Sequence, residues 1–209
     1  MDSYNCPHFV NELTLFIAVS YSGNTEETLS CTIEAKNRGA KIFSITSGGA
    51  LKNISDFTIT IPQGYQPRSA IGFLLMPIVN SLLPNISGDL QEIASNLKSV
   101  SEKEDEIKLL ANEIYSSGKT PYFVSWSPTR SVAYRCKTQF NENSKSFASS
   151  GSLSEMDHNE LVPMGTEKKI DPFFYIAFIN TFSKRNYFRL ELSKKLSGLK
   201  IKDIELKGK

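Results

Sequence analysis

The order of strand, helix and strand near the N-terminus limits the fold of this chain more than any other feature. Phe16–Val19 is a continuous apolar run, Glu26–Asn37 is a predicted helix ended by Arg38-Gly39, and Lys41–Thr46 is a second predicted strand. Such apolar runs are typical of strands that are buried on both faces. A helix between two strands at this spacing indicates parallel neighbours with a right-handed crossover. The sequence therefore predicts a βαβ unit in a parallel sheet.

The pattern continues through the first half of the chain. A third strand is predicted at Phe57–Ile61, where Pro62 ends it. The apolar stretch Ile71–Leu83 predicts a mostly buried helix with a kink or a break at Pro77. Leu90–Tyr115 has helical spacing with a charged middle, which favours one or two solvent-facing helices that link domains over a functional acidic patch.

Strands and helices alternate again after this helical stretch. The predicted elements, beginning with a strand, are Pro121–Trp126, Val132–Ala148, Phe173–Ile179, Lys184–Leu196 and Ile201–Leu206. Two such series predict an α/β protein with two doubly wound lobes, each a parallel sheet flanked by helices. We place the first lobe at residues 1–88, a helical linker at 89–118 and the second lobe at 119–209. The doubly wound pattern also predicts elements before Leu15 and after Leu206, so we expect both lobes to be incomplete.

Composition argues against several classes of protein. The 24 basic and 22 acidic residues leave a net charge of +2, so no nucleic-acid partner is expected. Apolar runs such as Ile71–Val79 are shorter than the roughly 20 residues that span a bilayer, and no signal peptide is recognisable. Cys6, Cys31 and Cys136 are widely spaced, which favours reduced thiols in a cytoplasmic protein without a membrane association. Two histidines and scattered cysteines predict no metal site.

Small polar residues after the first strand suggest an anion site. Ser20, Ser22 and Thr25 lie where ligands bind in open parallel sheets, beyond the carboxyl end of a strand. Gly23 permits a tight turn, and a helix that begins near Thr25 offers unpaired N–H groups to an anion. A simple helix cap, with Asn24 or Thr25 as the N-cap residue, explains the same pattern. From spacing alone both readings stay open.

Four ordered motifs carry a family resemblance. The string SYSGNTEET at Ser20–Thr28 resembles the phosphate-binding signature of the sugar isomerase (SIS) family. The later motifs PQGYQPRSAIGF, FNENSK and SEMDHNEL begin at Pro62, Phe140 and Ser154. Their order is similar to that of the bifunctional phosphoglucose/phosphomannose isomerases, over residues from about 10 to 162. Past Leu161 only the α/β pattern agrees.

This resemblance implies a function and a role for each matching residue. It implies a cofactor-independent enzyme that interconverts glucose 6-phosphate, and mannose 6-phosphate, with fructose 6-phosphate through an enediolate. It implies a homodimer with a shared active site, into which the histidine reaches from the partner. The implied residues are Ser20, Ser22 and Thr25 for the sugar phosphate, Arg68 facing the reacting carbons, Glu142 as base and His158 for ring opening. The family's N-terminal Gly/Ser-rich loop and C-terminal catalytic lysine have no match in this sequence.

The residue types at two of these positions suit the chemistry. Moving a proton between adjacent carbons needs a base that takes and returns it, and a carboxylate can do so if burial raises its pKa. Glu142 lies between Asn141 and Asn143, whose amides are expected to orient it, although an exposed helix acid is the alternative. Arg68 follows the stiff Pro67 and could stabilise a developing oxyanion, with a surface arginine as the alternative.

The histidines differ in their sequence context. His158 is flanked by Asp157 and Glu160, which we expect to raise its pKa so that it can pass a proton to the ring oxygen. A loop histidine in polar surroundings is the alternative. His8 lacks such neighbours and is expected to be structural.

Two other functions remain open at this stage. SIS-type lobes also serve as non-catalytic phosphosugar-binding modules in regulators, which would need the phosphate loop without Glu142, Arg68 and His158 together. Such regulators usually carry a basic DNA-binding segment, and none is recognisable here. An amidotransferase-like isomerase lobe would need a glutamine-hydrolysing domain, which this sequence does not contain.

Overall fold

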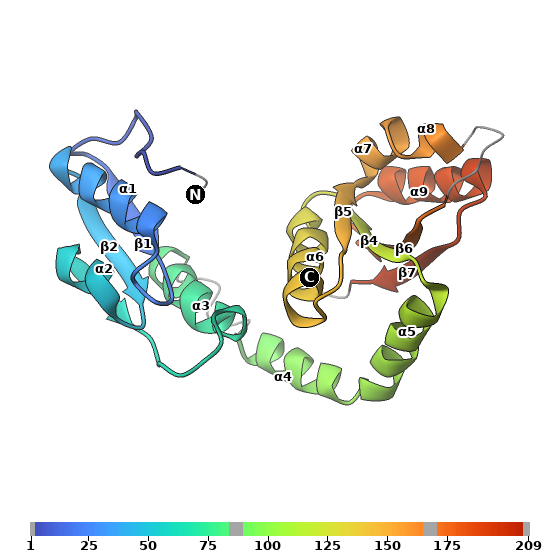
Figure 1. Ribbon diagram of the computed structural model, residues 1–209, viewed down its shortest axis with the longest axis horizontal. Coiled ribbons are helices and arrows are strands. Elements are labelled where there is room, and N and C mark those ends of the chain that lie inside the picture. The colour runs from blue at the N-terminus through green and yellow to red at the C-terminus, as the bar shows by residue number, and fades with distance from the viewer. Residues whose placement is uncertain (1–2, 84–89, 165–170, 207–209) are drawn as a thin grey trace. The chain divides into compact units, whose positions relative to one another are not determined.

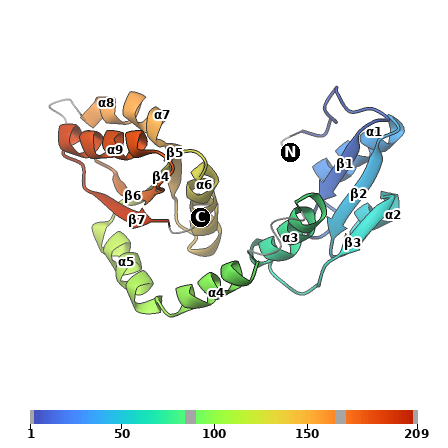
Figure 2. The ribbon, with the colours of Figure 1, turned by 180° about the vertical axis from the view of Figure 1, so that it is seen from behind.

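The computed structural model describes residues 3–83, 90–164 and 171–206, and the chain divides into two compact units, residues 1–99 and 100–209. Each unit has its own parallel sheet and its own core (Figures 1 and 2). This confirms the predicted α/β fold of parallel sheets flanked by helices. The lobe limits 1–88 and 119–209, with a linker at 89–118, stay a prediction. No helix within the described ranges has the length and hydropathy of a membrane span.

The first unit contains a three-stranded parallel sheet in the order β1-β2-β3. Phe16 of β1 pairs with Ile42 of β2, and Ile45 of β2 pairs with Ile59 of β3. The bounds predicted for α1 and β2 are confirmed, whereas α2 was not expected. The elements in chain order are β1 (Leu15–Val19), α1 (Glu26–Asn37), β2 (Lys41–Thr46), α2 (Gly49–Ile54), β3 (Phe57–Thr60), the 3-10 turn η1 (Pro67–Ser69) and α3 (Ile71–Leu82).

The core of the first unit lies between the sheet and helices α1 and α2. Phe16 and Ala18 alternate along β1 and therefore point to the same face of the sheet. They are buried together with Ile42 of β2, Cys31 of α1 and Leu51 of α2. Burial of one face strongly specifies the strand register. The carboxyl end of β1 is thereby held next to the start of α1.

Helix α3 differs from the prediction in its environment. The sequence predicts a mostly buried helix, but none of its described residues is buried, and Ile71, Leu75 and Leu82 are about half exposed at 47%, 50% and 52%. The helix continues through Pro77. Helices that are apolar on all sides are usually buried, so the exposure of α3 within its unit differs from the common pattern. A cavity of about 600 Å³ is lined by residues of α3 and of β3.

The second unit has a four-stranded parallel sheet in the order β5-β4-β6-β7. The stretch predicted as one or two solvent-facing helices forms two, α4 and α5, and Ile114 of α5 is buried in the core of this unit. The elements in chain order are α4 (Leu90–Ser101), which crosses the boundary between the units, α5 (Glu104–Ser117), β4 (Thr120–Ser125), α6 (Arg130–Asn143), β5 (Ser149–Ser152), α7 (Leu153–His158), α8 (Leu161–Met164), β6 (Phe173–Ile179), α9 (Lys184–Ser197) and β7 (Ile201–Glu205).

Helices cover both faces of this second sheet, as expected for a doubly wound lobe (Figures 1 and 2). One core joins Val124 of β4 to Met156 of α7 and Leu190 of α9. The other joins Phe123 of β4 to Ala133 of α6 and to Ile114. Because Phe123 and Val124 are adjacent in a strand, they point to opposite faces and serve the two cores separately.

The end of α6 lies earlier than the sequence predicts. The helix was expected to run to Ala148, but it ends at Asn143, and Lys145 has a left-handed backbone with φ of 55°. The backbone N–H of Ala148 then donates to Oδ1 of Asn141 at 2.7 Å, which closes the turn. The chain continues as β5, where Ser149 pairs with Tyr122. Pairing with β4 decides this strand, since serine and glycine have little strand preference of their own.

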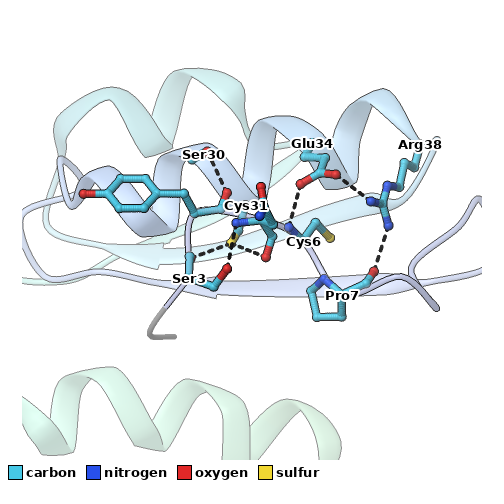
Figure 3. Close-up of polar contacts among 9 residues, drawn as sticks. Ser3, Cys6, Pro7, Ser30, Cys31, Glu34 and Arg38 are labelled. Carbon is cyan, nitrogen blue, oxygen red and sulfur yellow. Dashed lines mark hydrogen bonds and ion pairs between the residues drawn. The ribbon is translucent and has the colours of Figure 1, made fainter.

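The segment before β1 is fastened to α1 by polar contacts, which Figure 3 shows. The backbone N–H of Cys6 donates to Glu34 Oε2 at 2.6 Å. Arg38 donates to Glu34 Oε1 at 2.5 Å and to the carbonyl oxygen of Pro7 at 2.8 Å. The Cys31 thiol donates to two carbonyl oxygens of the same segment. The N–H of Cys6, followed by Arg38, lowers the pKa of Glu34 below its ordinary value.

Replacing Glu34 with glutamine should lower the thermal unfolding midpoint at pH 7 and leave it nearly unchanged in acid. A lowered folded-state pKa gives stability that is present above the unfolded pKa of about 4.3 and is lost as the pH falls through the folded value. Unfolding midpoints of wild type and Glu34→Gln from pH 7 down to pH 2 measure this gap. Glu12→Gln, an exposed glutamate of the same unit, is the control. A gap that persists at pH 2 would contradict the ionic explanation.

Candidate functional site

The loop after β1, residues Ser20–Thr25, gathers the three residues expected to bind a sugar phosphate, and we call it the phosphate loop. The Ser20 hydroxyl is buried at the carboxyl end of β1, lies 2.8 Å from Oγ1 of Thr25 and accepts the N–H of Gly23 at 3.1 Å. Ser22 is exposed, and its Oγ accepts the N–H of Asn24 at 3.2 Å. The structure therefore brings Ser20, Ser22 and Thr25 together at the start of the 12-residue helix α1.

The hydroxyl of Thr25 does not serve as a helix cap. Thr25 occupies the N-cap position of α1, but its side chain makes no cap hydrogen bond and pairs with Ser20 instead. Asn24 is also used elsewhere, because its Oδ1 accepts the N–H of Ala50 in α2 at 2.9 Å. The side chains of Asn24 and Thr25 therefore do not form the simple helix cap that the sequence left open. The first-turn N–H groups of α1 and the helix dipole face the loop and favour an anion there.

Close packing against the loop after β2 shapes the phosphate loop. Gly23 has φ of 68°, and a Cβ atom there would lie 1.8 Å from the carbonyl oxygen of Gly48. A Cβ on Gly49, whose φ is 74°, would lie 2.4 Å from the carbonyl oxygen of Ser22. The N–H of Leu51 donates to the carbonyl oxygen of Gly23 at 2.9 Å. Only glycine allows the two backbones to approach this closely, because it has no Cβ atom. The loops after β1 and β2 are therefore packed backbone against backbone.

Arg68 belongs to the same unit as the phosphate loop. It is half-buried in η1, directly after Pro67. The chain between β3 and η1 is tied to the loop after β2, because Nε2 of Gln63 donates to the carbonyl oxygen of Ser47 at 2.7 Å. Sequence reasoning missed Ser47 and Gln63. The signal that could have found Ser47 is its place after a buried strand, the same place that Ser20 holds after β1.

Glu142 lies in the last turn of α6 and is exposed within its unit. Its carbonyl oxygen accepts a hydrogen bond from Nζ of Lys145 at 2.7 Å. The neighbouring Asn141, expected to orient the Glu142 carboxylate, uses its Oδ1 for the N–H of Ala148. Asn141 therefore fixes the turn after α6, and with it the end of the helix that carries Glu142.

His158 is the last residue of α7 and is exposed within its unit. The two flanking acids, expected to act on its ring, have partners elsewhere. Asp157 accepts a hydrogen bond from Ser193 at 2.6 Å and forms an ion pair with Arg189 at 2.9 Å, both on α9. The other acid, Glu160, is described next. The segment that carries His158 is thus anchored to the body of the unit through its acidic neighbours.

Glu160 is bound to β4. Its Oε1 accepts the Tyr122 hydroxyl at 2.6 Å, and its Oε2 is buried without a hydrogen-bond partner among the described residues. Burial, followed by this hydrogen bond, raises the pKa of Tyr122, and burial raises that of Tyr175 nearby to about 12. A Cβ on Gly151 of β5 would lie 2.1 Å from the Tyr122 hydroxyl oxygen, so glycine leaves room for this contact.

The predicted site residues fall into two groups. Ser20, Ser22, Thr25 and Arg68 lie in the first unit, whereas Glu142 and His158 lie in the second, at the ends of α6 and α7. Among residues 3–83, 90–164 and 171–206, no group of three or more His, Cys, Asp or Glu side chains could hold a metal ion. The first unit offers hydroxyls, a helix start and an arginine, and the second offers an acid and a histidine. These are the groups that the predicted chemistry would use for binding, charge stabilisation and proton transfer.

Comparison with known proteins gives matches along nearly the whole chain. Residues 7–84 match the SIS domain, and residues 103–209 match the bacterial phospho-glucose isomerase C-terminal SIS domain. The bifunctional phosphoglucose/phosphomannose isomerase of Thermoplasma acidophilum is 45% identical over 207 residues, which cover 99% of this chain and 66% of that protein. The protein of the same name from Thermoplasma volcanium is 40% identical over 208 residues, which cover 100% of this chain and 68% of that protein. The chain thus spans about two thirds of the length of these relatives.

Solved structures agree with the fold. The crystal structure of a glucosamine-6-phosphate deaminase from Thermotoga maritima has a TM-score of 0.68 and 21% identity, and the match covers 92% of this chain and 60% of that chain. At this identity the likeness shows the fold alone.

Proposed function

Since the chain belongs to the family of bifunctional phosphoglucose/phosphomannose isomerases built from SIS domains, we propose that it carries an aldose–ketose isomerase site for hexose 6-phosphates. The reaction interconverts glucose 6-phosphate, and also mannose 6-phosphate, with fructose 6-phosphate. The observation that carries this proposal is the cluster of Ser20, Ser22 and Thr25 at the start of α1, in a chain whose relatives bear that enzyme's name.

The phosphate group binds in the phosphate loop. A sugar phosphate is a dianion near neutral pH, and α1 presents its positive dipole end to the loop. Ser22 and Thr25 offer exposed hydroxyls, while Ser20 supports the loop from inside. Hydroxyl donors hold the phosphate without adding a positive charge. This leaves the cation Arg68 for the reacting end of the sugar.

Proton transfer is the task of Glu142. The carboxylate takes the proton from C2 of the open-chain aldose, and the protonated acid then gives a proton to C1 of the enediolate. The proton of the C2 hydroxyl passes to the oxygen on C1, so that C2 becomes the ketone. Exchange of the acid with water between the two transfers lets solvent hydrogen enter the sugar. Arg68 stabilises the negative oxygen of the enediolate. His158 passes a proton to the ring oxygen, which opens the cyclic sugar before isomerisation. The mechanism uses no metal ion and no cofactor.

A symmetric homodimer completes this proposal. Glu142 and His158 are exposed within their unit, so a second subunit has access to both. Two-fold dimers are the commonest oligomers, and their interface places the same residue in both sites. We infer that each site uses the partner subunit's His158. Light scattering that found a fully active monomer would contradict this part of the proposal. The protein is further inferred to be cytoplasmic, which suits the free thiols of its three cysteines.

An activity assay tests the proposed function. The protein should convert glucose 6-phosphate and mannose 6-phosphate to fructose 6-phosphate, and should keep its activity in the presence of EDTA. A folded protein that binds hexose 6-phosphates without converting them would instead support the second candidate, a phosphosugar-binding module. That candidate is favoured by the SIS fold alone and gives no role to Glu142.

A further inference from the structure

We propose that Tyr21 is a positioning residue that couples the phosphate loop to the segment Pro62–Ser69, which carries Arg68. This inference rests on the proposed function, because it assigns Arg68 to the reacting end of the substrate. Tyr21 lies between Ser20 and Ser22, so its backbone belongs to the phosphate loop. Its side chain, by contrast, reaches the other segment.

The Tyr21 hydroxyl holds both ends of a short turn. It accepts the backbone N–H of Tyr65 at 2.8 Å and donates to the carbonyl oxygen of Pro62 at 3.3 Å. The phenol thereby uses its donor and an acceptor position together. Gly64, between these two contacts, has φ of 89°, which suits glycine and gives the turn its shape. One hydroxyl thus fixes the backbone three residues ahead of Arg68.

A second connection runs through the loop after β2. The carbonyl oxygen of Tyr21 accepts the Ser47 N–H at 2.9 Å and the Ser47 hydroxyl at 2.7 Å. The carbonyl oxygen of Ser47 in turn accepts Nε2 of Gln63 at 2.7 Å. The hydrogen bonds of the Tyr21 hydroxyl and those of its carbonyl oxygen thus both connect Tyr21 to the turn that precedes Arg68. A displacement of Tyr21 therefore moves the supports of this segment on both sides.

The Arg68 segment lies at the surface of its unit. Residues 62–67 are all exposed, and the Tyr65 ring meets Phe73 of α3 with centroids 5.1 Å apart. Loss of the Tyr21 hydroxyl should loosen the turn at Tyr65, while α1, β1, the phosphate loop and the Ser47–Gln63 hydrogen bond keep their own contacts. The position of Arg68 should then change, whereas the binding of phosphate should not.

The variant Tyr21→Phe tests this inference by separating kcat from KM. We expect kcat for glucose 6-phosphate to fall roughly tenfold, since a displaced charge stabilises the enediolate less well. KM and the affinity for inorganic phosphate should change less than about threefold, because the hydroxyls that bind phosphate remain. Tyr115→Phe removes a hydroxyl from a side chain that is 87% exposed and is the matched control. An unchanged kcat in folded Tyr21→Phe would overturn the proposal.

Hydrogen exchange gives a readout that does not depend on activity. Inorganic phosphate should slow amide exchange in residues 62–70 of the wild type, above all at Tyr65, and should not do so in Tyr21→Phe. Protection of the same size in both proteins would overturn the coupling. If the wild type shows phosphate-dependent protection but no isomerase activity, the coupling stands and the proposed function fails. The two proposals are therefore tested separately.

Discussion

Replacing Glu142 with glutamine lowers isomerisation by roughly 10²–10⁴-fold, the usual contribution of a positioned general base. Glutamine keeps the shape of the side chain but cannot accept the C2 proton. Affinity for the substrate should change little, because phosphate binding is assigned to Ser22 and its neighbours in the other unit. Since Glu142 is exposed on the last turn of α6, the substitution should leave the stability of the unit nearly unchanged. A fall in kcat with an intact fold is therefore the expected result.

The decisive measurement for Glu142 is exchange of the C2 hydrogen of the substrate with deuterated water, followed by NMR. Wild type should exchange it readily, and Glu142→Gln should not. Glu106→Gln, an exposed glutamate on α5, is the matched control and should exchange like the wild type. His158→Ala should instead slow the reaction of the cyclic sugar, since its task ends once the ring is open. Rapid exchange by folded Glu142→Gln would mean that another group moves the proton.

Replacing Ser20 and Ser22 together with alanine weakens binding of hexose 6-phosphate by roughly 10²-fold. Hydrogen bonds to a charged group contribute about 1.5–3 kcal/mol each, and about 1.4 kcal/mol corresponds to a tenfold change in affinity. Ser20 also accepts the N–H of Gly23, so part of the loss comes from a less ordered loop. The kcat at saturating substrate should fall much less than KM rises, because Ser22 binds the phosphate, and Ser20 supports the loop, in the ground state and the transition state alike.

Single variants separate the two effects within the phosphate loop. Ser22 is exposed, and its hydroxyl accepts the N–H of Asn24 at 3.2 Å, so Ser22→Ala should weaken binding roughly tenfold and loosen the loop less than loss of the buried Ser20. Ser131→Ala changes an exposed serine in the first turn of α6 and is the matched control. Calorimetric titration with glucose 6-phosphate and with inorganic phosphate gives the affinities. Unchanged affinity in the folded double variant would reject the phosphate loop as the binding site.

The placement of the predicted site depended on two different kinds of information. The position of Ser20, Ser22 and Thr25 was predicted from local order, because residues after a buried strand and before a helix lie at the carboxyl edge of a parallel sheet. The roles of Asp157 and Glu160 were not found in this way. The Asp157 side chain binds Ser193 of α9, 36 positions away in the sequence. The Glu160 side chain binds Tyr122 of β4, 38 positions away. Sequence neighbourhood with His158 did not reveal these long-range partners.

The sequence by itself determined the elements whose signals are local. Strand β6 and helix α1 have the predicted bounds, since apolar runs, helical spacing and the terminal Arg38-Gly39 depend on neighbouring residues only. Their alternation was enough to imply parallel sheets, because a crossover helix between adjacent strands allows little else.

Tertiary structure alone decided the features that depend on contacts between distant segments. Strand β5 is built of serine and glycine and exists because β4 pairs with it, which also ends α6 at Asn143. The exposure of α3 within its unit does not follow from its apolar composition. The Tyr21 hydroxyl finds partners 41 and 44 residues away. Strand pairing, burial and long-range hydrogen bonds each need two segments in contact. The local sequence of one segment does not specify which other segment it will contact.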